Sequence, residues 1–136
     1  MKPKIIPLRM MGDDRGSLVA VETHQDLPFE LQRVYYIFGT KEGVERGFHA
    51  HKNLQQVAVA VRGSCTMVLD NGVEKVEVQL NNPTQGLYIG TMLWHFMKNF
   101  TEDCVLLVFA DQHYIESDYI RNYSDFLELL SDTPKQ

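Results

Sequence analysis

The sequence predicts an all-β fold with one short helix near its C-terminal end. Apolar runs rich in Val, Ile, Leu, Tyr and Phe recur about every 8–12 residues between clusters of turn residues, and no helical pattern separates them. Strands that follow one another in this way favour a sandwich or a small barrel over a parallel α/β sheet. The pair Asn71-Gly72 stands between two of these runs. It is a strong hairpin signal, and the two-residue turn that it favours needs positive φ at two positions.

The expected strands follow the apolar runs along the chain. They cover residues 18–22, 33–38, 55–62, 65–69, 73–80, 86–89 and 104–110. The expected helix begins at Ser124, whose hydroxyl can cap the first turn, and Asp125 complements the helix dipole there. Phe126, Leu129 and Leu130 fall on one face at helical spacing, so we expect the helix to pack against the outside of the β domain.

Size and charge limit what the chain can be. Its 136 residues suffice for a single domain, residues 1–136, with one hydrophobic core. Hydrophobic residues make up 44% and charged residues 23%, which excludes a disordered or fibrous chain. The formal net charge of -5 argues against nucleic acid as a partner, because binding to a phosphate backbone normally needs an excess of basic residues. An anionic small molecule can still bind where a few arginines gather.

The sequence also predicts a compartment. The longest apolar run, residues 104–110, is far shorter than the ~20 residues that cross a bilayer, so no membrane contact is expected. Pro3, Pro7 and Arg9 interrupt the N-terminal segment before a signal-like apolar stretch develops. Cys65 and Cys104 lie in apolar, strand-like runs and are expected to be reduced core residues. We therefore expect a cytoplasmic protein.

Five histidines occur in the chain, and two of them form a pair that suggests chemistry. His49 and His51 are two residues apart, so on a strand their imidazoles project from the same face. Burying two imidazoles side by side is costly unless each has a partner or a function. Two hydrogen-bonded or surface histidines remain an alternative. His24 and His113 are expected at the surface, and Trp94 in the core.

The spacing around this pair resembles the two sequence motifs of the cupin superfamily. The matching residues are Gly43, His49, His51, Gln56 and Gly63 for the first motif, and His95 and Asn99 for the end of the second. Metal-binding cupins usually have a glutamate separated from the second histidine by three or four residues, where this chain has Gln55 and Gln56. A neutral amide is a poor ligand for a divalent cation, so we expect no metal. Three histidines alone can still hold iron or zinc, and that alternative stays open.

Longer stretches resemble successive signatures of the sugar 3,4-ketoisomerases. These are residues 14–20, 33–38, 46–51, 63–65, 86–89, 94–95 and 118–123. The resemblance implies a homodimeric cupin β-roll without a cofactor that acts on dTDP-4-keto-6-deoxy-D-glucose, in a pathway to a dTDP-linked 3-amino-3,6-dideoxyhexose. Moving the ketone from C4 to C3 needs a base of near-neutral pKa and passes through an enediol(ate), and it has no net redox change. We expect His49 and His51 to be the acid/base pair.

The resemblance also suggests residues that bind the substrate. Arg15, Arg46 and His95 are expected to line the sugar pocket. Arg15 with His95 resembles the branch that yields dTDP-3-keto-6-deoxy-D-galactose, whereas the branch yielding the gluco epimer has Tyr and Arg at these positions. For the diphosphate, Arg33, Arg46 and Arg121 are candidates, because guanidinium groups bind phosphate oxygens in pairs.

Tyrosines are candidates for the thymine. Tyr35, Tyr36 and Tyr88 can stack on the base or pack in the core. Tyr35 and Tyr36 face opposite sides of a strand, so at most one of them points into the barrel.

Other functions remain as alternatives. They are a ketoisomerase giving the gluco epimer, a 3,5-epimerase of nucleotide sugars, a three-histidine metal-dependent dioxygenase, and a sugar-binding cupin without activity.

Overall fold

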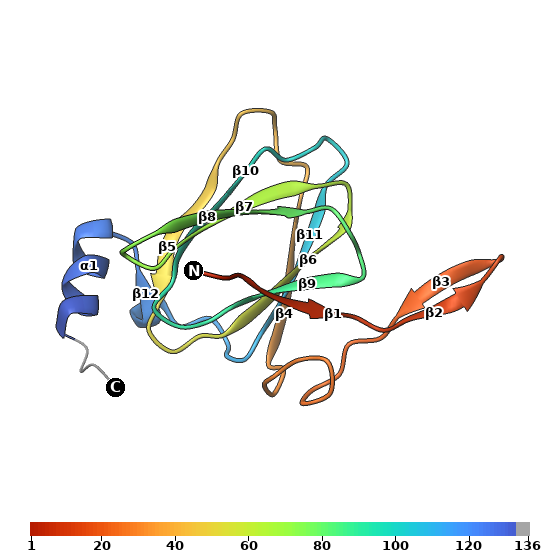
Figure 1. The fold of residues 1–136 in the computed structure, drawn as a ribbon, viewed down its shortest axis with the longest axis horizontal. Helices are drawn as coiled ribbons and strands as arrows, with labels where there is room; N and C mark the ends of the chain where they lie inside the picture. The colour runs from red at the N-terminus through yellow and green to blue at the C-terminus, as the bar shows by residue number, and fades with distance from the viewer. Residues whose placement is uncertain (133–136) are drawn as a thin grey trace.

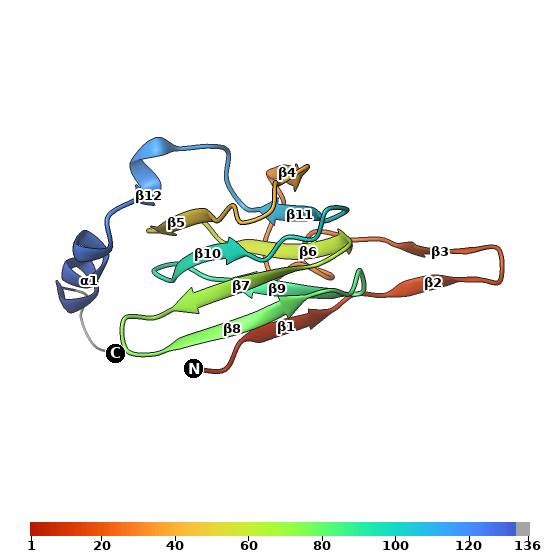
Figure 2. The ribbon, with the colours of Figure 1, turned by 90° about the horizontal axis from the view of Figure 1, so that it is seen from above.

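Two five-stranded antiparallel sheets face each other in the computed structural model, which describes residues 1–132 (Figures 1 and 2). The first sheet has the order β1-β9-β6-β11-β4. Its strands are β1 (Lys4–Pro7), β9 (Gln85–Ile89), β6 (Gln56–Arg62), β11 (Val105–Ala110) and β4 (Arg33–Phe38). The second sheet has the order β12-β5-β10-β7-β8. Its strands are β12 (Tyr119–Ile120), β5 (Arg46–His51), β10 (Trp94–Lys98), β7 (Cys65–Asp70) and β8 (Lys75–Leu80).

Four further elements of the described residues lie outside these sheets. Strands β2 (Met10–Asp13) and β3 (Gly16–Val19) pair only with each other and form an arm that projects from the body (Figures 1 and 2). A short 3-10 helix, η1 (Glu116–Asp118), precedes β12, and the helix α1 (Tyr123–Asp132) follows it. The all-β class and the short helix near the C-terminal end are therefore confirmed.

Most apolar runs form the strands that the sequence predicts. Strands β4, β6, β7, β8, β9 and β11 match the expected ranges to within about two residues at each end. The strand expected at 18–22 is wrong, because β3 ends at Val19. Strands β1, β2, β10 and β12 were not expected, and β5 was expected only as the strand that carries His49 and His51. Strands β2 and β10 hold no β-branched residue, and β1 and β12 are only four and two residues long, so their local preference is weak and pairing with neighbouring strands makes these segments strands.

The hairpin at Asn71-Gly72 is confirmed, but its turn differs from the expected one. Strands β7 and β8 pair from Asp70 to Lys75, so the loop is longer than two residues. Gly72 has a φ of 91°, whereas Asn71 is not among the residues with positive φ. The Asn71 side-chain oxygen accepts hydrogen bonds from the backbone N–H groups of Val73 and Glu74. Asn71 thus shapes the turn through its side chain rather than through a left-handed backbone.

The main core lies between the sheets and includes both cysteines. Cys65 and Cys104 are free and buried beside Met67, Leu87 and Leu106. Their expected position in the core is confirmed. A second apolar cluster, around Val57, Val59 and Phe109, lies on the other side of the first sheet.

The helix α1 covers the outside of the second sheet. Its Phe126 is fully buried against Trp94 and Ile120, and the core position expected for Trp94 is confirmed. The helix begins one residue earlier than expected, and the side chain of Asn122, not Ser124, accepts the hydrogen bond from the Asp125 N–H.

The face that this helix presents to the sheet is narrower than predicted. Leu130 packs against the Phe126 cluster, but Leu129 is 36% exposed.

His24 and His113 are exposed, as expected. Within residues 1–132, no helix has the length and apolar character needed to span a bilayer.

Candidate active site

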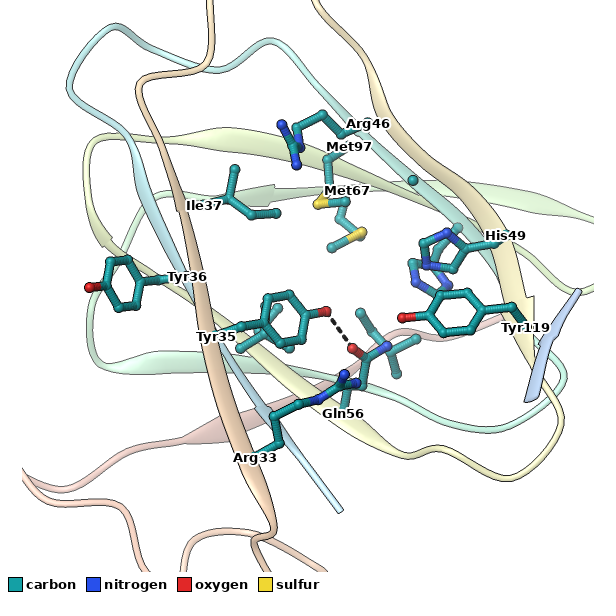
Figure 3. Close-up of a pocket in the computed structure, with 15 residues that line it drawn as sticks. Arg33, Tyr35, Tyr36, Ile37, Arg46, His49, Gln56, Met67, Met97 and Tyr119 are labelled. Carbon is teal, nitrogen blue, oxygen red and sulfur yellow. Dashed lines mark hydrogen bonds between the residues drawn. The ribbon is translucent and has the colours of Figure 1, made fainter. Parts of the chain in front are cut away.

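A cavity of about 290 Å³ opens between the two sheets (Figure 3). One wall comes from β4 and β6, and the opposite wall from β5, β10 and β12. Met67 and Met97 form an apolar part of the lining. Further apolar lining comes from Ile37, Ala58, Ile89 and Val108, and the polar part of the lining combines arginine, tyrosine, histidine and glutamine. The residues are Arg33, Tyr35, Arg46, His49, Gln56, His95 and Tyr119.

A bulge in β5 brings Arg46 and His49 into the same cavity. The register between β10 and β5 shifts at this point, where Phe96 pairs with Gly47 and His95 with His49, so Phe48 has no backbone partner on β10 in the described register. Gly47 and Phe48 both have positive φ, at 102° and 62°. In an unbroken strand, residues three apart face opposite sides. The bulge cancels this alternation, and Arg46 therefore faces the cavity together with His49.

Three imidazoles gather at the inner end of the cavity. His49 and His51 come from β5, and His95 comes from the neighbouring strand β10. The ring centroid of His49 lies 4.9 Å from that of His51 and 4.8 Å from that of His95. His49 and His95 line the cavity, whereas His51, 2% exposed, lies behind them. The paired imidazoles expected from the sequence are therefore adjacent, and only one of them reaches the cavity surface.

Burial keeps these imidazoles uncharged. Desolvation, and then the neighbouring His95 and His51, lowers the pKa of His49 from 6.5 to about 3. Desolvation, His95 and Arg33 likewise lower the pKa of His51 to about 3. Burial also lowers the pKa of His95. At neutral pH all three rings are proton acceptors.

The hydrogen bonds of the rings differ. His95 Nδ1 lies 3.0 Å from the carbonyl oxygen of Leu93. Because a carbonyl oxygen can only accept, the neutral His95 donates through Nδ1 and keeps Nε2 as its basic nitrogen. The Nδ1 atoms of His49 and His51 are buried and have no hydrogen-bond partner within residues 1–132.

Tyr35 and Gln56 form a linked pair on the opposite wall. The Tyr35 hydroxyl donates a hydrogen bond to Gln56 Oε1 at 2.5 Å (Figure 3). Burial raises the pKa of Tyr35 to about 12, so this hydroxyl stays protonated. Tyr36 points away from the cavity and is 61% exposed. Gln55 does not line the cavity, and its side chain binds Asp111.

The arginines expected at the site have different positions. Arg33 and Arg46 line the cavity, and the Arg33 guanidinium lies 5.3 Å from the Tyr35 ring centroid. The buried Nε of Arg33 has no hydrogen-bond partner in the described part of the chain. Arg121 is outside the lining, where it binds Glu116 and lies over the Tyr119 ring. Arg15 is on the exposed arm beside Asp13, and the structure does not place it at the cavity of its own chain.

Sequence reasoning missed two cavity residues. Tyr119 lies on a two-residue strand, whose length is too short to show a period-2 pattern. Its ring centroid is 4.4 Å from that of His51 and 5.1 Å from that of His49. Gln56 was considered only as a missing metal ligand. Its place after two inward histidines in the cupin-like motif was the signal that could have identified it as a cavity residue.

The side chains present match a metal centre only in part. One ligand nitrogen from each of His49, His51 and His95 lies within 4.8 Å of the other two. However, the fourth cupin position is held by Gln56, which is neutral and whose Oε1 already accepts from Tyr35. Within residues 1–132, the group of candidate ligands therefore contains no carboxylate that would balance a divalent cation.

Comparisons with known proteins agree with this site. The family described as "FdtA: WxcM-like, C-terminal" matches residues 1–131. A TDP-4-oxo-6-deoxy-alpha-D-glucose-3,4-oxoisomerase from Aneurinibacillus thermoaerophilus is 47% identical over 131 residues, which are 96% of this chain and 94% of that protein.

Solved structures show the same likeness. The WlaRB TDP-quinovose 3,4-ketoisomerase from Campylobacter jejuni is 48% identical with a TM-score of 0.89, over 93% of this chain and 97% of that one. A mutant of the 3,4-ketoisomerase QdtA from Thermoanaerobacterium thermosaccharolyticum, in complex with TDP-4-keto-6-deoxyglucose, is 40% identical with a TM-score of 0.93, over 95% and 94% of the two chains. The chain thus belongs to the FdtA, WxcM-like family, the sugar 3,4-ketoisomerases of cupin fold.

Proposed function

We propose that the protein converts dTDP-4-keto-6-deoxy-D-glucose into dTDP-3-keto-6-deoxy-D-galactose by metal-independent proton transfer. The observation that carries this proposal is the cluster of uncharged imidazoles at the inner end of a cavity that also holds two arginines. The named relatives act on, or bind, the same class of substrate. The product would enter the synthesis of a dTDP-linked 3-amino-3,6-dideoxyhexose.

His49 takes the proton from C3 of the sugar in this proposal. It lines the cavity and is neutral, so it can accept a proton without first losing one. The C3–H bond breaks, and its electron pair forms the C3=C4 double bond of the enediolate while the C4 carbonyl oxygen becomes the oxyanion. A proton is then added to C4, and the proton that leaves the C3 hydroxyl goes to the oxygen on C4, which leaves the ketone at C3. His51 lies directly behind His49 and supplies the second acid/base group. The negative diphosphate raises the pKa of both imidazoles in the complex and strengthens them as bases.

Donors on the opposite wall stabilise the enediolate oxygen. Because Gln56 Oε1 accepts from Tyr35, the Gln56 amide N–H groups are left to donate to the sugar. Figure 3 shows this nitrogen on the side of Gln56 that faces Tyr119, whose hydroxyl also points into the cavity. Preorganised donors of this kind act where charge develops and need no rearrangement during the reaction.

The diphosphate binds the arginines at the cavity. Arg33 has a buried Nε without a partner, which an anionic ligand would satisfy. Arg46 lines the same cavity, and paired guanidinium–phosphate hydrogen bonds suit both residues. Arg121 is bound to Glu116 in an ion pair, so it contacts the diphosphate only after that ion pair opens. With the ion pair intact, Arg121 lies over the Tyr119 ring and acts on the site through that ring.

The site is completed by a second copy of the chain in a homodimer. Strand β4 exposes Val34, Tyr36 and Phe38 on its outer face, and an apolar groove of about 300 Å³ runs between the base of the arm and the first sheet. Apolar surface of this kind is typical of an interface. A partner covering it would receive the arm, and with it Arg15, which lies near the tip of the arm.

Mixing two inactive variants tests whether Arg15 acts across the dimer. Arg15→Ala and His51→Asn subunits are unfolded together and refolded as mixed dimers. If Arg15 reaches the partner's cavity, one site of each mixed dimer has both residues and activity returns. If Arg15 acts in its own chain, no site is complete and the mixture stays inactive. Sedimentation of the wild type measures the dimer itself.

The galacto product rests on Arg15 and His95 as a pair. His95 lines the cavity beside His49, where it can direct the face on which C4 is protonated. Overall identity does not decide this point, since a TDP-quinovose enzyme is 48% identical. Proton NMR of the product decides it, because the coupling constants of the C4 proton differ between the two epimers.

The same assay tests the reaction class. Incubation with dTDP-4-keto-6-deoxyglucose in heavy water, followed by NMR, should show the ketone at C3 with deuterium at C4. Inversion at C3 or C5 with the ketone still at C4 would instead identify an epimerase. The variants His49→Asn and His51→Asn should each lose about 10²–10⁴-fold in kcat and still bind dTDP. Unchanged turnover in both variants would refute the proposed mechanism.

The three-histidine cluster favours a metal-dependent dioxygenase as the second candidate. Dialysis against EDTA separates the two candidates. Ketoisomerase activity that survives with less than about one tenth of a metal ion per chain supports the proposal, and activity that returns only on adding iron or zinc supports the alternative.

We also infer a cytoplasmic location, which agrees with two free cysteines in the core.

A further inference from the structure

Asp118 is a buried carboxylate that the proposed reaction does not yet use. It is 5% exposed at the end of η1, immediately before Tyr119 of β12. Its two oxygens accept hydrogen bonds from the backbone N–H groups of Asn53, at 2.7 Å, and Leu54, at 3.1 Å. Asp118 therefore fixes the loop between β5 and β6 to the segment that carries Tyr119.

The same carboxylate faces His51. Its Oδ2 lies 3.4 Å from Nδ1 of His51, and both side chains are almost completely buried. This Nδ1 has no hydrogen-bond partner within residues 1–132. A buried polar atom without a hydrogen-bond partner is rare and costs free energy. The carboxylate of Asp118 is an acceptor close to this Nδ1 atom. A small rotation of the imidazole would turn the contact into a hydrogen bond.

The direction of that hydrogen bond determines the tautomer. An ionised carboxylate can only accept, so His51 must donate through Nδ1. Its Nε2 then carries the lone pair. His95 has the same tautomer for a different reason, since its Nδ1 faces the Leu93 carbonyl.

We propose that Asp118 is a positioning residue that holds His51 in the Nδ1–H tautomer, with Nε2 as the basic nitrogen. Asp118 acts through His51 and does not itself touch the sugar. When His51 takes up a proton during the reaction, the adjacent carboxylate also stabilises the imidazolium. The kinetic part of this proposal rests on the proposed function, whereas the tautomer does not.

The variant Asp118→Asn tests the proposal. An asparagine side chain still offers an oxygen to the loop, but its amide group donates toward Nδ1 and favours the opposite tautomer of His51. Nitrogen-15 NMR of labelled protein should show a protonated Nδ1 on His51 in the wild type and a protonated Nε2 in the variant. We expect kcat to fall about tenfold or more with little change in the Kd for dTDP.

Asp70→Asn is the matched control. Asp70 is 3% exposed and also accepts two hydrogen bonds, from the Gly72 N–H and the Tyr123 hydroxyl, but within residues 1–132 it has no hydrogen bond to the three histidines. It should lose thermal stability as Asp118→Asn does, and keep both the kcat and the His51 tautomer of the wild type.

A double variant separates positioning from folding. In a His51→Asn background, adding Asp118→Asn should cause no further loss of kcat. An equal further loss there, or a His51 tautomer that is the same with and without Asp118, would overturn the proposal. If the wild type has no ketoisomerase activity but its tautomer switches as described, the proposed function fails and the positioning role stands.

Discussion

Tyr35 and Gln56 are joined by a 2.5 Å hydrogen bond in which the tyrosine hydroxyl donates to the amide oxygen. The bond fixes the amide of Gln56 at a position where metal-binding cupins carry a carboxylate. In the proposed reaction, this position supplies a hydrogen-bond donor for an anion in place of a ligand for a cation. This exchange suits a reaction that builds up negative charge on a sugar oxygen.

Replacing Gln56 with leucine should remove this donor. We expect kcat to fall about 10²–10³-fold, the range seen when one preorganised oxyanion donor is lost. Tyr35→Phe should cause a smaller loss, because the amide stays but its orientation is no longer fixed. Gln55→Leu is the control, since Gln55 binds Asp111 instead of lining the cavity. Equal kcat in the Gln55 and Gln56 variants would contradict a catalytic donor.

The low pKa values of the histidines predict an unusual pH profile. A base with a pKa of 6.5 would leave only about one tenth of kcat/KM at pH 5.5. His49 and His51 have pKa values of about 3 in the free protein. We therefore expect kcat/KM at pH 5.5 to stay above half of its value at pH 7.5. Steady-state rates with dTDP-4-keto-6-deoxyglucose measure this, and circular dichroism checks that the protein remains folded.

The free energy of unfolding should depend on pH more strongly than kcat/KM does. In the unfolded chain each histidine takes up a proton below about pH 6.5, whereas His49 and His51 stay neutral in the folded chain down to a pKa of about 3. Between these values the unfolded state binds more protons. The free energy of unfolding should therefore fall with decreasing pH, by up to about 1.4 kcal/mol per pH unit for each histidine.

Urea unfolding between pH 7 and 5 measures this dependence. Carboxylates whose pKa the fold lowers, such as Glu116 with a pKa of about 2, contribute mainly at lower pH, so this range isolates the histidines. The His51→Asn variant should show a shallower dependence than the wild type. The same slope in both proteins would mean that His51 is not held neutral.

The bulge in β5 predicts a position where alanine is harmful. Gly47 has a φ of 102°, and a Cβ there would lie 3.1 Å from the His95 carbonyl oxygen and 3.1 Å from the Phe96 Cα. Gly47→Ala should cost about 1–3 kcal/mol of stability and also lower kcat, because relief of the contact moves His49 or His95.

Gly39→Ala provides the comparison for this substitution. Gly39 also has positive φ, at 66°, but a Cβ there would meet nothing within 4 Å. It should cost about 1 kcal/mol and leave kcat unchanged. Thermal unfolding and turnover of the two variants, measured together, separate backbone strain from displacement of the site.

Strands whose inward-facing residues are apolar can be predicted from the sequence. Strands are missed where polar residues of the cavity occupy the inward-facing positions. Strand β6 is a continuous apolar run and is recognised at once. Strand β10 reads Trp-His-Phe-Met-Lys, because one of its inward positions is His95, and it has no clear pattern. The strand end at Val19 was missed for another reason, since residues beyond it pack in an apolar cluster without pairing.

The same distinction applies to the site. His49 and His51 follow from period-2 spacing on one strand, which needs no knowledge of the rest of the fold. Arg46 was assigned to the sugar pocket by resemblance. Its position in the cavity depends on the bulge in β5, which cannot be predicted from the local sequence Arg-Gly-Phe-His. Tyr119 reaches the cavity only because β12 pairs with His51 and Ala50, and such a long-range contact leaves no local pattern.

The arm of β2 and β3 has a consequence for how the protein is made. Met10 is 60% exposed and Leu18 57%, on two strands that have unpaired outer edges. Such edges are templates for aggregation in a newly synthesised chain. In the homodimer proposed above, a second molecule covers the arm, and this encounter is bimolecular, so dilution lengthens the time for which the arm is exposed. If that dimer forms, refolding yield should pass through an optimum in protein concentration, with losses to slow dimerisation below it and to precipitation above it.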